Sequence, residues 1–167
     1  MPGQVRFSNP RTLAPPPGYS YVVEATGPCR TIYFAGQLGL DMDNNLVGEQ
    51  GDFRAQCIKA LDNMTLALEA AGARWSDVVK INNYVVDIQT NIAIYREIRD
   101  RYVNRAAPPA STTIGVPALA RPGGLFEVEA VAVLPIGRTA TARKPSSVKR
   151  TASKTRAGKT RARKARR

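Results

Sequence analysis

Apolar residues recur at helical spacing in two segments of the chain. In the first, the apolar positions follow steps of four, four, three, four and three, namely Phe53, Cys57, Leu61, Met64, Leu68 and Ala71. Asp52 is a typical N-cap and Gly72 a typical C-terminal stop, so we predict a helix between them. A second helix is predicted from about Asn91 to Asn104, with its apolar face formed by Ile94, Tyr95, Ile98 and Tyr102.

Runs rich in β-branched and aromatic residues predict strands between and around these helices. They cover residues 4–7, 19–25, 31–41, 76–88, 111–119 and 125–135. The second and third runs are separated only by the turn-forming stretch TGPCR, which predicts that they pair as a hairpin. This order of elements indicates an α+β fold, with a mixed sheet and both helices packed on one of its faces.

The last predicted strand, LFEVEAVAVLP, carries two carboxylates on one face. Side chains alternate across a strand, so Glu127 and Glu129 share a face with Val131 and Val133, opposite the face of Phe126. A buried carboxylate is costly unless a partner compensates its charge. The glutamate face therefore meets solvent, a second subunit or a site, and its valines favour cover by another subunit.

Charge divides the chain into two unequal parts. The net charge is +12, but the segment from Arg143 onward holds 12 Lys and Arg and no acidic residue, which leaves 13 basic and 13 acidic residues before it. We predict a neutral domain over 1–137 and a disordered basic tail over 138–167, since the tail has almost no large apolar residue.

Such a tail would bind the phosphates of DNA or RNA without reading sequence. An association with the nucleoid would follow, while the alternative is a solubilising appendage. The candidate contacts are Lys144, Lys149, Arg150, Lys154, Arg156, Lys159, Arg161, Arg163 and Lys164.

The chain has no histidine and only two cysteines, Cys29 and Cys57. These cannot form a disulfide framework or a structural zinc site, so we expect no metal and no cofactor. Cys57 lies on the apolar helix face, which is typical of a small buried hydrophobe. We find no signal peptide and no apolar run long enough for a membrane span, so we expect a cytoplasmic protein that makes no membrane contact.

Several motifs together resemble the RidA/YjgF family of reactive-intermediate deaminases, also called L-PSP endoribonuclease-like proteins. They cover roughly residues 4–136 and follow the family's order: GYS, FAGQLGLD, VGEQ, LEAAGARWSDVVK, NYVVDI, PASTTIGV and FEVEAVAV. The resemblance implies a chorismate-mutase-like subunit and a homotrimer with three clefts between subunits. It implies a small-molecule partner, an imine, enamine or keto compound, and no cofactor.

The same resemblance implies roles for single residues. Glu127 matches the cleft glutamate that places the water attacking an imine carbon, whereas Glu129 is expected to be structural. Tyr19, Gly36 and Thr113 match positions that line the cleft. Two plainer interpretations stay open: interface polarity for Glu127 and ordinary packing for Tyr19.

The chain departs from the family at the anion-binding position. In PASTT, Ser111 stands where the deaminases carry an arginine that holds the substrate carboxylate, and serine cannot replace that bidentate contact. Arg121 is a substitute candidate, with a solvated loop charge as the alternative, and Arg30 or Arg105 could also reach the cleft. Ser111 is no nucleophile candidate, because neither a histidine nor a Ser-Lys pair would activate it.

Two functions follow from this combination. The first is a RidA-like hydrolase that adds water to an enamine or imine and releases ammonia, with a substrate altered by the missing arginine. The second is a non-catalytic trimer that binds a small metabolite in the same cleft and associates with nucleic acid through its tail. A ribonuclease has little support, since there is no histidine pair and no metal-binding carboxylate cluster.

Overall fold

The computed structural model of the chain describes residues 1–136. Within them it forms six strands and two α-helices, together with one short 3₁₀ helix. The predictions made for the basic tail, including all nine candidate nucleic-acid contacts, lie outside the described residues.

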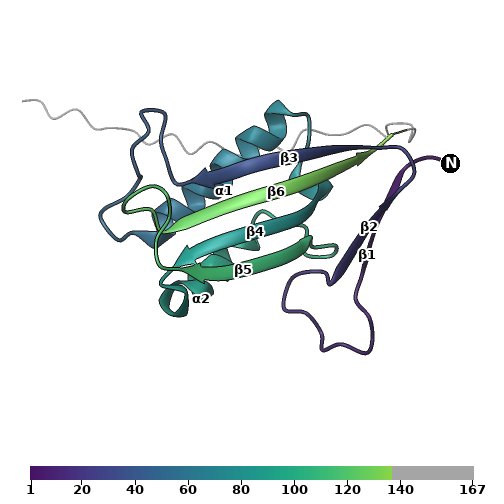
Figure 1. Cartoon of the computed structure of the whole chain (residues 1–167), viewed down its shortest axis with the longest axis horizontal. Helices are drawn as coiled ribbons and strands as arrows, with labels where there is room; N and C mark the ends of the chain where they lie inside the picture. Colours follow the sequence, from purple (N-terminus) through teal and green to yellow (C-terminus); the bar gives the residue numbers. More distant parts are fainter. Residues whose placement is uncertain (137–167) are drawn as a thin grey trace, which may run out of the picture.

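A four-stranded mixed sheet forms the centre of the fold (Figure 1). Its strand order is β3-β6-β4-β5, in which β6 is antiparallel to both neighbours and β4 is parallel to β5. The bounds of these strands are β3 Cys29–Leu38, β4 Val78–Val86, β5 Ala110–Val116 and β6 Phe126–Pro135. The parallel β4–β5 pair requires a crossover, and helix α2 provides it.

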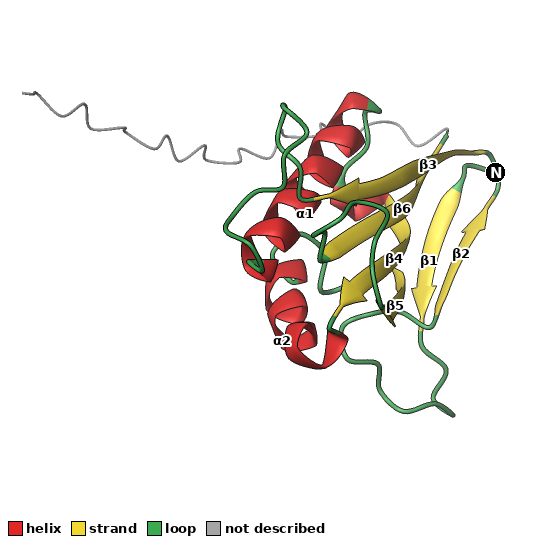
Figure 2. Cartoon of the chain, turned by 60° about the vertical axis from the view of Figure 1, so that its left-hand side comes forward, coloured by secondary structure: helices red, strands yellow, loops and turns green. Residues whose placement is uncertain are grey.

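Both helices cover the same face of this sheet (Figure 2), which confirms the predicted α+β class. Helix α1 spans Phe53–Ala70, and five of its six predicted apolar positions are buried in the core: Phe53, Cys57, Leu61, Met64 and Leu68. The sixth, Ala71, is the C-cap and is half-buried. The Asp52 side chain accepts a hydrogen bond from the N–H of Ala55, and Gly72 adopts a φ of +69° just after the helix, as an N-cap and a C-terminal stop should. Burial raises the pKa of the Cys57 thiol to about 12.

Helix α2 spans Ile88–Arg99, so it begins and ends earlier than the predicted range 91–104. Its start follows Asp87, a residue with positive φ that ends β4 directly. The chain after Arg99 continues as turns to Asn104. Tyr95 and Ile98 are buried as the apolar pattern predicted. The ring of Tyr102 packs at a tilted angle against that of Trp75, in the 3₁₀ helix η1 (Trp75–Asp77).

The predicted hairpin between residues 19–25 and 31–41 is wrong. Strand β2 (Val22–Thr26) pairs with β1 (Gln4–Ser8) in a separate two-stranded sheet, and β3 pairs with β6 instead. The turn between β2 and β3 does reverse the chain, but β3 then joins a longer and more buried partner. The ribbon of β1 and β2 is fastened to the end of β6, where the N–H of Gly3 donates to the carbonyl of Ile136 at 3.1 Å.

The face of the sheet opposite the helices stays partly open in the single chain. On β6 the residues Phe126 and Val128 of the helix face are buried, whereas Glu127 and Glu129 are half-buried. Tyr33 of β3, directly opposite Val131 of β6, is 79 % exposed. Apolar and charged side chains therefore lie together on one uncovered surface.

Candidate functional site

Two of the predicted site residues, Gly36 and Glu127, lie against each other on neighbouring strands. A Cβ built on Gly36 would be 1.8 Å from Oε1 of Glu127, so only glycine leaves room for the carboxylate there. The pairing of β3 with β6 shifts register between Phe34 and Gln37, at this point of the sheet. Bulges of this kind often re-aim a side chain next to an active site.

The two glutamates of β6 have different surroundings. Oε1 of Glu129 accepts hydrogen bonds from Nδ2 of Asn82 at 2.5 Å and from the hydroxyl of Tyr84 at 3.0 Å. The bond to Glu129 raises the pKa of Tyr84. Glu127 makes no hydrogen bond or ion pair with another side chain among the described residues. Glu129 is thus tied to β4, while the Glu127 carboxylate is available to a ligand.

A cavity of about 340 Å³ brings together three other predicted residues, Tyr19, Ser111 and Thr113. Ser20 holds Tyr19 in place, because its N–H donates to the carbonyl of Pro109 at 3.1 Å and its hydroxyl to that of Pro108 at 2.7 Å. This tether sets the loop before β2 beside the first residues of β5. The remaining lining comes from the same loop and from α2: Pro17, Ile88, Ile92, Tyr95, Arg96 and Arg99.

Two buried polar atoms, on Asn83 next to the cavity and on Tyr95 in its lining, have no hydrogen bond of ordinary geometry within residues 1–136. Asn83 donates through Nδ2 to the hydroxyls of Ser111 at 3.3 Å and Thr113 at 3.1 Å, but its Oδ1 accepts nothing. The hydroxyl of Tyr95, a residue only 1 % exposed, also has no hydrogen bond of ordinary geometry, although it lies close enough to Thr113 and Ser111 to interact with their side chains. Burial raises the pKa of Tyr95, so its hydroxyl keeps its proton. Unsatisfied buried groups call for a water or ligand.

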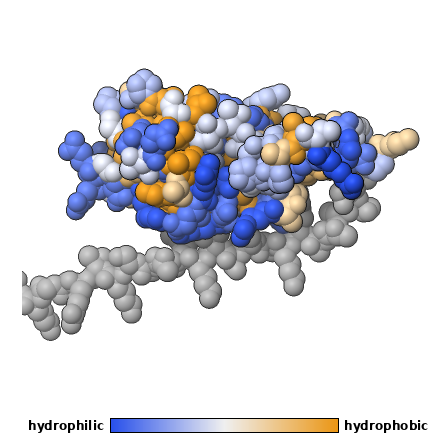
Figure 3. Space-filling view, turned by 90° about the horizontal axis from the view of Figure 1, so that it is seen from below, coloured by the Kyte–Doolittle hydropathy of each residue, from blue (hydrophilic) through white to orange (hydrophobic). Residues whose placement is uncertain are grey.

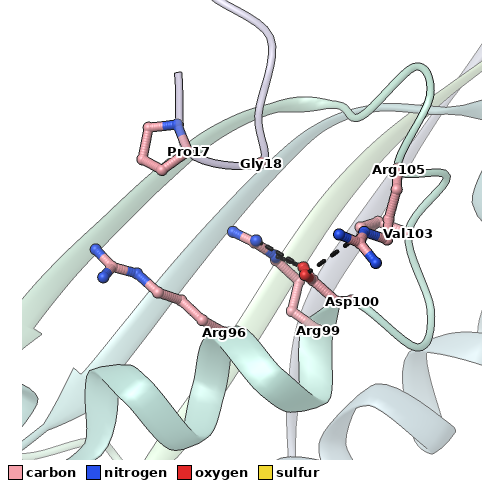
Figure 4. Close-up of a pocket in the computed structure, with 7 residues that line it drawn as sticks. All are labelled: Pro17, Gly18, Arg96, Arg99, Asp100, Val103 and Arg105. Carbon is pink, nitrogen blue, oxygen red and sulfur yellow. Dashed lines mark hydrogen bonds and ion pairs between the residues drawn. The ribbon is translucent and has the colours of Figure 1, made fainter. Parts of the chain in front are cut away.

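A second cavity, of about 420 Å³, shares Pro17, Arg96 and Arg99 with the first. Three arginines line it with a single carboxylate, that of Asp100 (Figure 4). Arg99 donates to Oδ1 of Asp100 through Nη2 at 2.7 Å and Nε at 3.0 Å, and Arg105 lies 3.8 Å from the other oxygen. The joined cavities therefore carry net positive charge.

The surroundings of these cavities are mixed in polarity. Figure 3 views the molecule from the side on which α2 and the loop before β2 lie in Figure 1, and it shows hydrophobic and hydrophilic residues next to one another. A pocket of this kind suits a small polar ligand better than an extended apolar one.

Within one chain, Glu127 and the cavity lie on opposite faces of the sheet. Ser111 pairs in register with Ile81, and Ile81 with Ala130, and both of these are buried beneath the helices. Residues in register share a face, so Ser111 faces the helix side. Glu127 alternates with the buried Phe126 and faces the open side. The structure brings the predicted residues together as two separate groups.

Of the arginines that the sequence offered as substitutes, only one lines a cavity. Arg121 lies in the loop before β6 and donates to the carbonyl of Asn44 at 2.8 Å, outside both cavities. Arg30 donates to the carbonyl of Ala71 at the end of α1. Arg105 does line a cavity. Sequence reasoning missed Arg96 and Arg99, although Arg99 follows Tyr95 by four residues and so shares its helix face.

Comparison with known proteins places this architecture in a family. Residues 11–134 match the family model described as endoribonuclease L-PSP. The chain belongs to this family. The predicted resemblance to RidA/YjgF proteins is thereby confirmed.

Relatives in the L-PSP family include a protein of the mite Dermatophagoides farinae named 2-iminobutanoate/2-iminopropanoate deaminase. It is 32 % identical over 124 residues, which cover 73 % of this chain and 91 % of the mite protein. The human protein of the same name is 35 % identical over 104 residues, covering 62 % and 73 % of the two chains.

Solved structures of the family share the fold. The Rid family protein YyfB of Yersinia pestis, described as of unknown function, superposes with a TM-score of 0.68 at 37 % identity and covers 78 % of this chain and 98 % of its own. RidA of an Antarctic Psychrobacter gives a TM-score of 0.57 at 29 % identity, with 69 % and 89 % coverage.

Two kinds of feature are missing from residues 1–136. No group of three or more Cys, Asp or Glu side chains is arranged to hold a metal ion there. None of the helices in this part of the chain combines the length and the apolar character needed to cross a bilayer.

Proposed function

We propose that this chain is a RidA-like hydrolase that converts enamine or imine intermediates into carbonyl compounds and ammonia. The observation that carries the proposal is the Glu127 carboxylate, which lies over Gly36 without a side-chain partner in the described part of the chain. Relatives named as imine deaminases support the same reaction class.

The reaction requires only a placed water and proton transfers. Glu127 accepts a proton as the water oxygen bonds to the imine carbon, and the C=N π electrons move to nitrogen, which takes a proton. The carbinolamine then breaks its C–N bond, forms the C=O bond and releases ammonia. Tyr19, Ser111 and Thr113 would contact the substrate, and no metal or organic cofactor takes part in these steps.

A homotrimer completes the proposed site. Three chains would associate through the open sheet face, where the exposed Tyr33 and Ile114 share a face with the glutamates. Apolar surface that is uncovered in one subunit is typical of an oligomer interface. Each seam would join Glu127 of one chain to the Tyr19–Ser111 cavity of the next, which reconciles the opposite faces that these residues occupy.

The test is ammonia release from 2-iminopropanoate generated in situ. We expect the wild-type chain to exceed the buffer rate and Glu127→Gln to lower kcat/KM by about 10² to 10⁴, the range for a lost general base. Glu129→Gln is the matched control on the same face of β6, and its amide oxygen can still accept from Asn82 and Tyr84. A wild-type rate equal to buffer, with a metabolite raising Tm, would instead support the non-catalytic alternative.

The segregated charge supports a second activity, the binding of nucleic acid by the tail. Twelve basic and no acidic residues lie from Arg143 onward, beyond a domain without net charge. Deleting residues 143–167 should abolish binding to random-sequence DNA at low salt while leaving turnover unchanged. Binding in the full chain should also fall steeply with salt. Retention of DNA binding after the deletion would move that activity to the neutral domain.

A further inference from the structure

We infer that Arg96 and Arg99 of helix α2 form the anion-binding site of the cleft and take over the role that Ser111 cannot perform. The inference rests on the proposed function for its reaction, but it concerns binding alone. The ligand class is a small carbonyl or imine compound with a carboxylate, which the two guanidinium groups would hold beside Ser111.

Arg99 is fixed in position before any ligand arrives. Arg99 is only 6 % exposed, and two of its nitrogens donate to Asp100. Its guanidinium carbon lies 5.8 Å from the centre of the Tyr95 ring. A Cβ on Gly18, which has a φ of +85°, would come within 2.4 Å of Nη2 of Arg99. The glycine of the GYS motif thus leaves space for this guanidinium.

Arg99 keeps part of its donor capacity. The two bonds to Asp100 use Nη2 and Nε, so the two N–H groups of Nη1 have no partner within residues 1–136. A guanidinium that is already immobilised loses little further freedom when it binds a carboxylate. This arrangement favours a tight and directional contact.

Arg96 supplies a second positive charge at the same cavity. It lies one turn before Arg99, is exposed, and has no ion pair or side-chain hydrogen bond in the described part of the chain (Figure 4). With Arg105, the joined cavities hold three arginines against Asp100 alone. This imbalance attracts an anion, since Asp100 neutralises only one of the three charges.

Independent support comes from the polar atoms behind the cavity. The Tyr95 hydroxyl is buried without a hydrogen bond of ordinary geometry, beside Ser111 and Thr113, on a residue that lines the same cavity as Arg96. A hydroxyl that keeps its proton can donate to a carboxylate oxygen. The structure thus offers two cations and one neutral donor around a space of about 340 Å³.

The test measures binding of 2-oxobutanoate, a stable keto acid, by calorimetry on the full chain. We expect 2-oxobutanoate to bind at least tenfold more tightly than its neutral amide. Arg96→Gln should weaken it about 10-fold and Arg99→Gln about 100-fold, as expected for lost charge-assisted contacts. Arg101→Gln, which removes a nearby charge that pairs with Glu97 instead, is the matched control and should change Kd less than about threefold.

A charge-swap variant keeps the inference testable if Arg99→Gln fails to fold. Adding Ser111→Arg to the Arg96→Gln chain should restore most of the lost affinity, because it returns a guanidinium to the same cavity. Equal binding of acid and amide, or no binding of the acid to the wild-type chain, would overturn the inference. Wild-type affinity in both folded single variants, Arg96→Gln and Arg99→Gln, would overturn it as well.

The outcomes separate the inference from the proposed function. Arginine-dependent keto-acid binding without imine turnover would overturn only the hydrolase. Turnover of 2-iminopropanoate with a KM unaffected by Arg96→Gln and Arg99→Gln would overturn only the arginine site.

Discussion

The two halves of the candidate cleft differ in how well their residues match the family motif. In the Gly36–Glu127 half, both residues match the motif of the family that the sequence resembles. The Glu127 carboxylate occupies the space that a Cβ at position 36 would need. In the Ser111 half, the motif arginine is absent and cations from α2 surround the space instead. On the function and the arginine site proposed above, the reacting group is retained while the ligand-holding group lies on another element. The comparison suggests that binding is the more adaptable part of this fold.

Among changes that leave Glu127 and the α2 arginines in place, the largest effect is expected at Gly36. In Gly36→Ala the new methyl group would displace the Glu127 carboxylate, whose flexible end can move without disturbing the sheet. We expect kcat to fall about 10- to 100-fold, because a misplaced base loses most of its effect, while Tm and the affinity for 2-oxobutanoate stay close to wild type. Steady-state kinetics and calorimetry on the same preparation would check this. An unchanged kcat would mean that the fit of Gly36 to Glu127 has no catalytic role.

A smaller effect is expected at Tyr95, in the other half. Tyr95→Phe removes a buried hydroxyl that has no hydrogen bond of ordinary geometry within residues 1–136, although Thr113 and Ser111 lie close to it, so the stability of the ligand-free chain should change by less than about 1 kcal/mol. The same change should weaken 2-oxobutanoate binding about 3- to 10-fold, through the lost hydrogen bond. Urea unfolding and calorimetry measure the two consequences. Weaker folding with unchanged binding would show that the hydroxyl serves the core instead of the ligand.

The smallest effect is expected from Ser111→Arg in the otherwise unchanged chain. A third guanidinium beside Arg96 and Arg99 gains a contact with the carboxylate but meets repulsion from the others, so kcat/KM should change by less than about threefold. The assay of ammonia release gives this ratio directly. A rise of about 100-fold would show that the α2 arginines do not replace the missing one.

The elements with strong local signals were predictable from sequence. Asp52 and Gly72 bound the first helix as their capping preferences require, and the alternation in β6 separates buried Phe126 from half-buried Glu127. The pairing of β2 was not predictable. A short turn predicts a hairpin from neighbours in sequence, whereas β3 joins β6, about a hundred residues away, because that partner lies in the helix-covered sheet.

The candidate site was predictable only where a motif survives. Gly36 and Glu127 were identified from motif matches, and the structure places them in contact. The role proposed for Arg99 needs the loop at Gly18, the ring of Tyr95 and the carboxylate of Asp100 to converge around one guanidinium. Its position four residues after Tyr95 was a signal, but a charged residue beside an apolar face more commonly lies in solvent.

The division of the cleft between subunits can be tested most directly by mixing two defective chains. The Glu127→Gln chain lacks the reacting half of each seam, and the double variant Arg96→Gln/Arg99→Gln lacks the anion-binding half. Each variant alone should therefore have little activity. Coexpressed with different tags and purified as mixed trimers, the two chains should recover about a third of wild-type activity, because every mixed cyclic trimer reunites two intact halves at one of its three seams. Verified mixed trimers that remain as inactive as their parents would contradict a cleft shared between neighbouring chains.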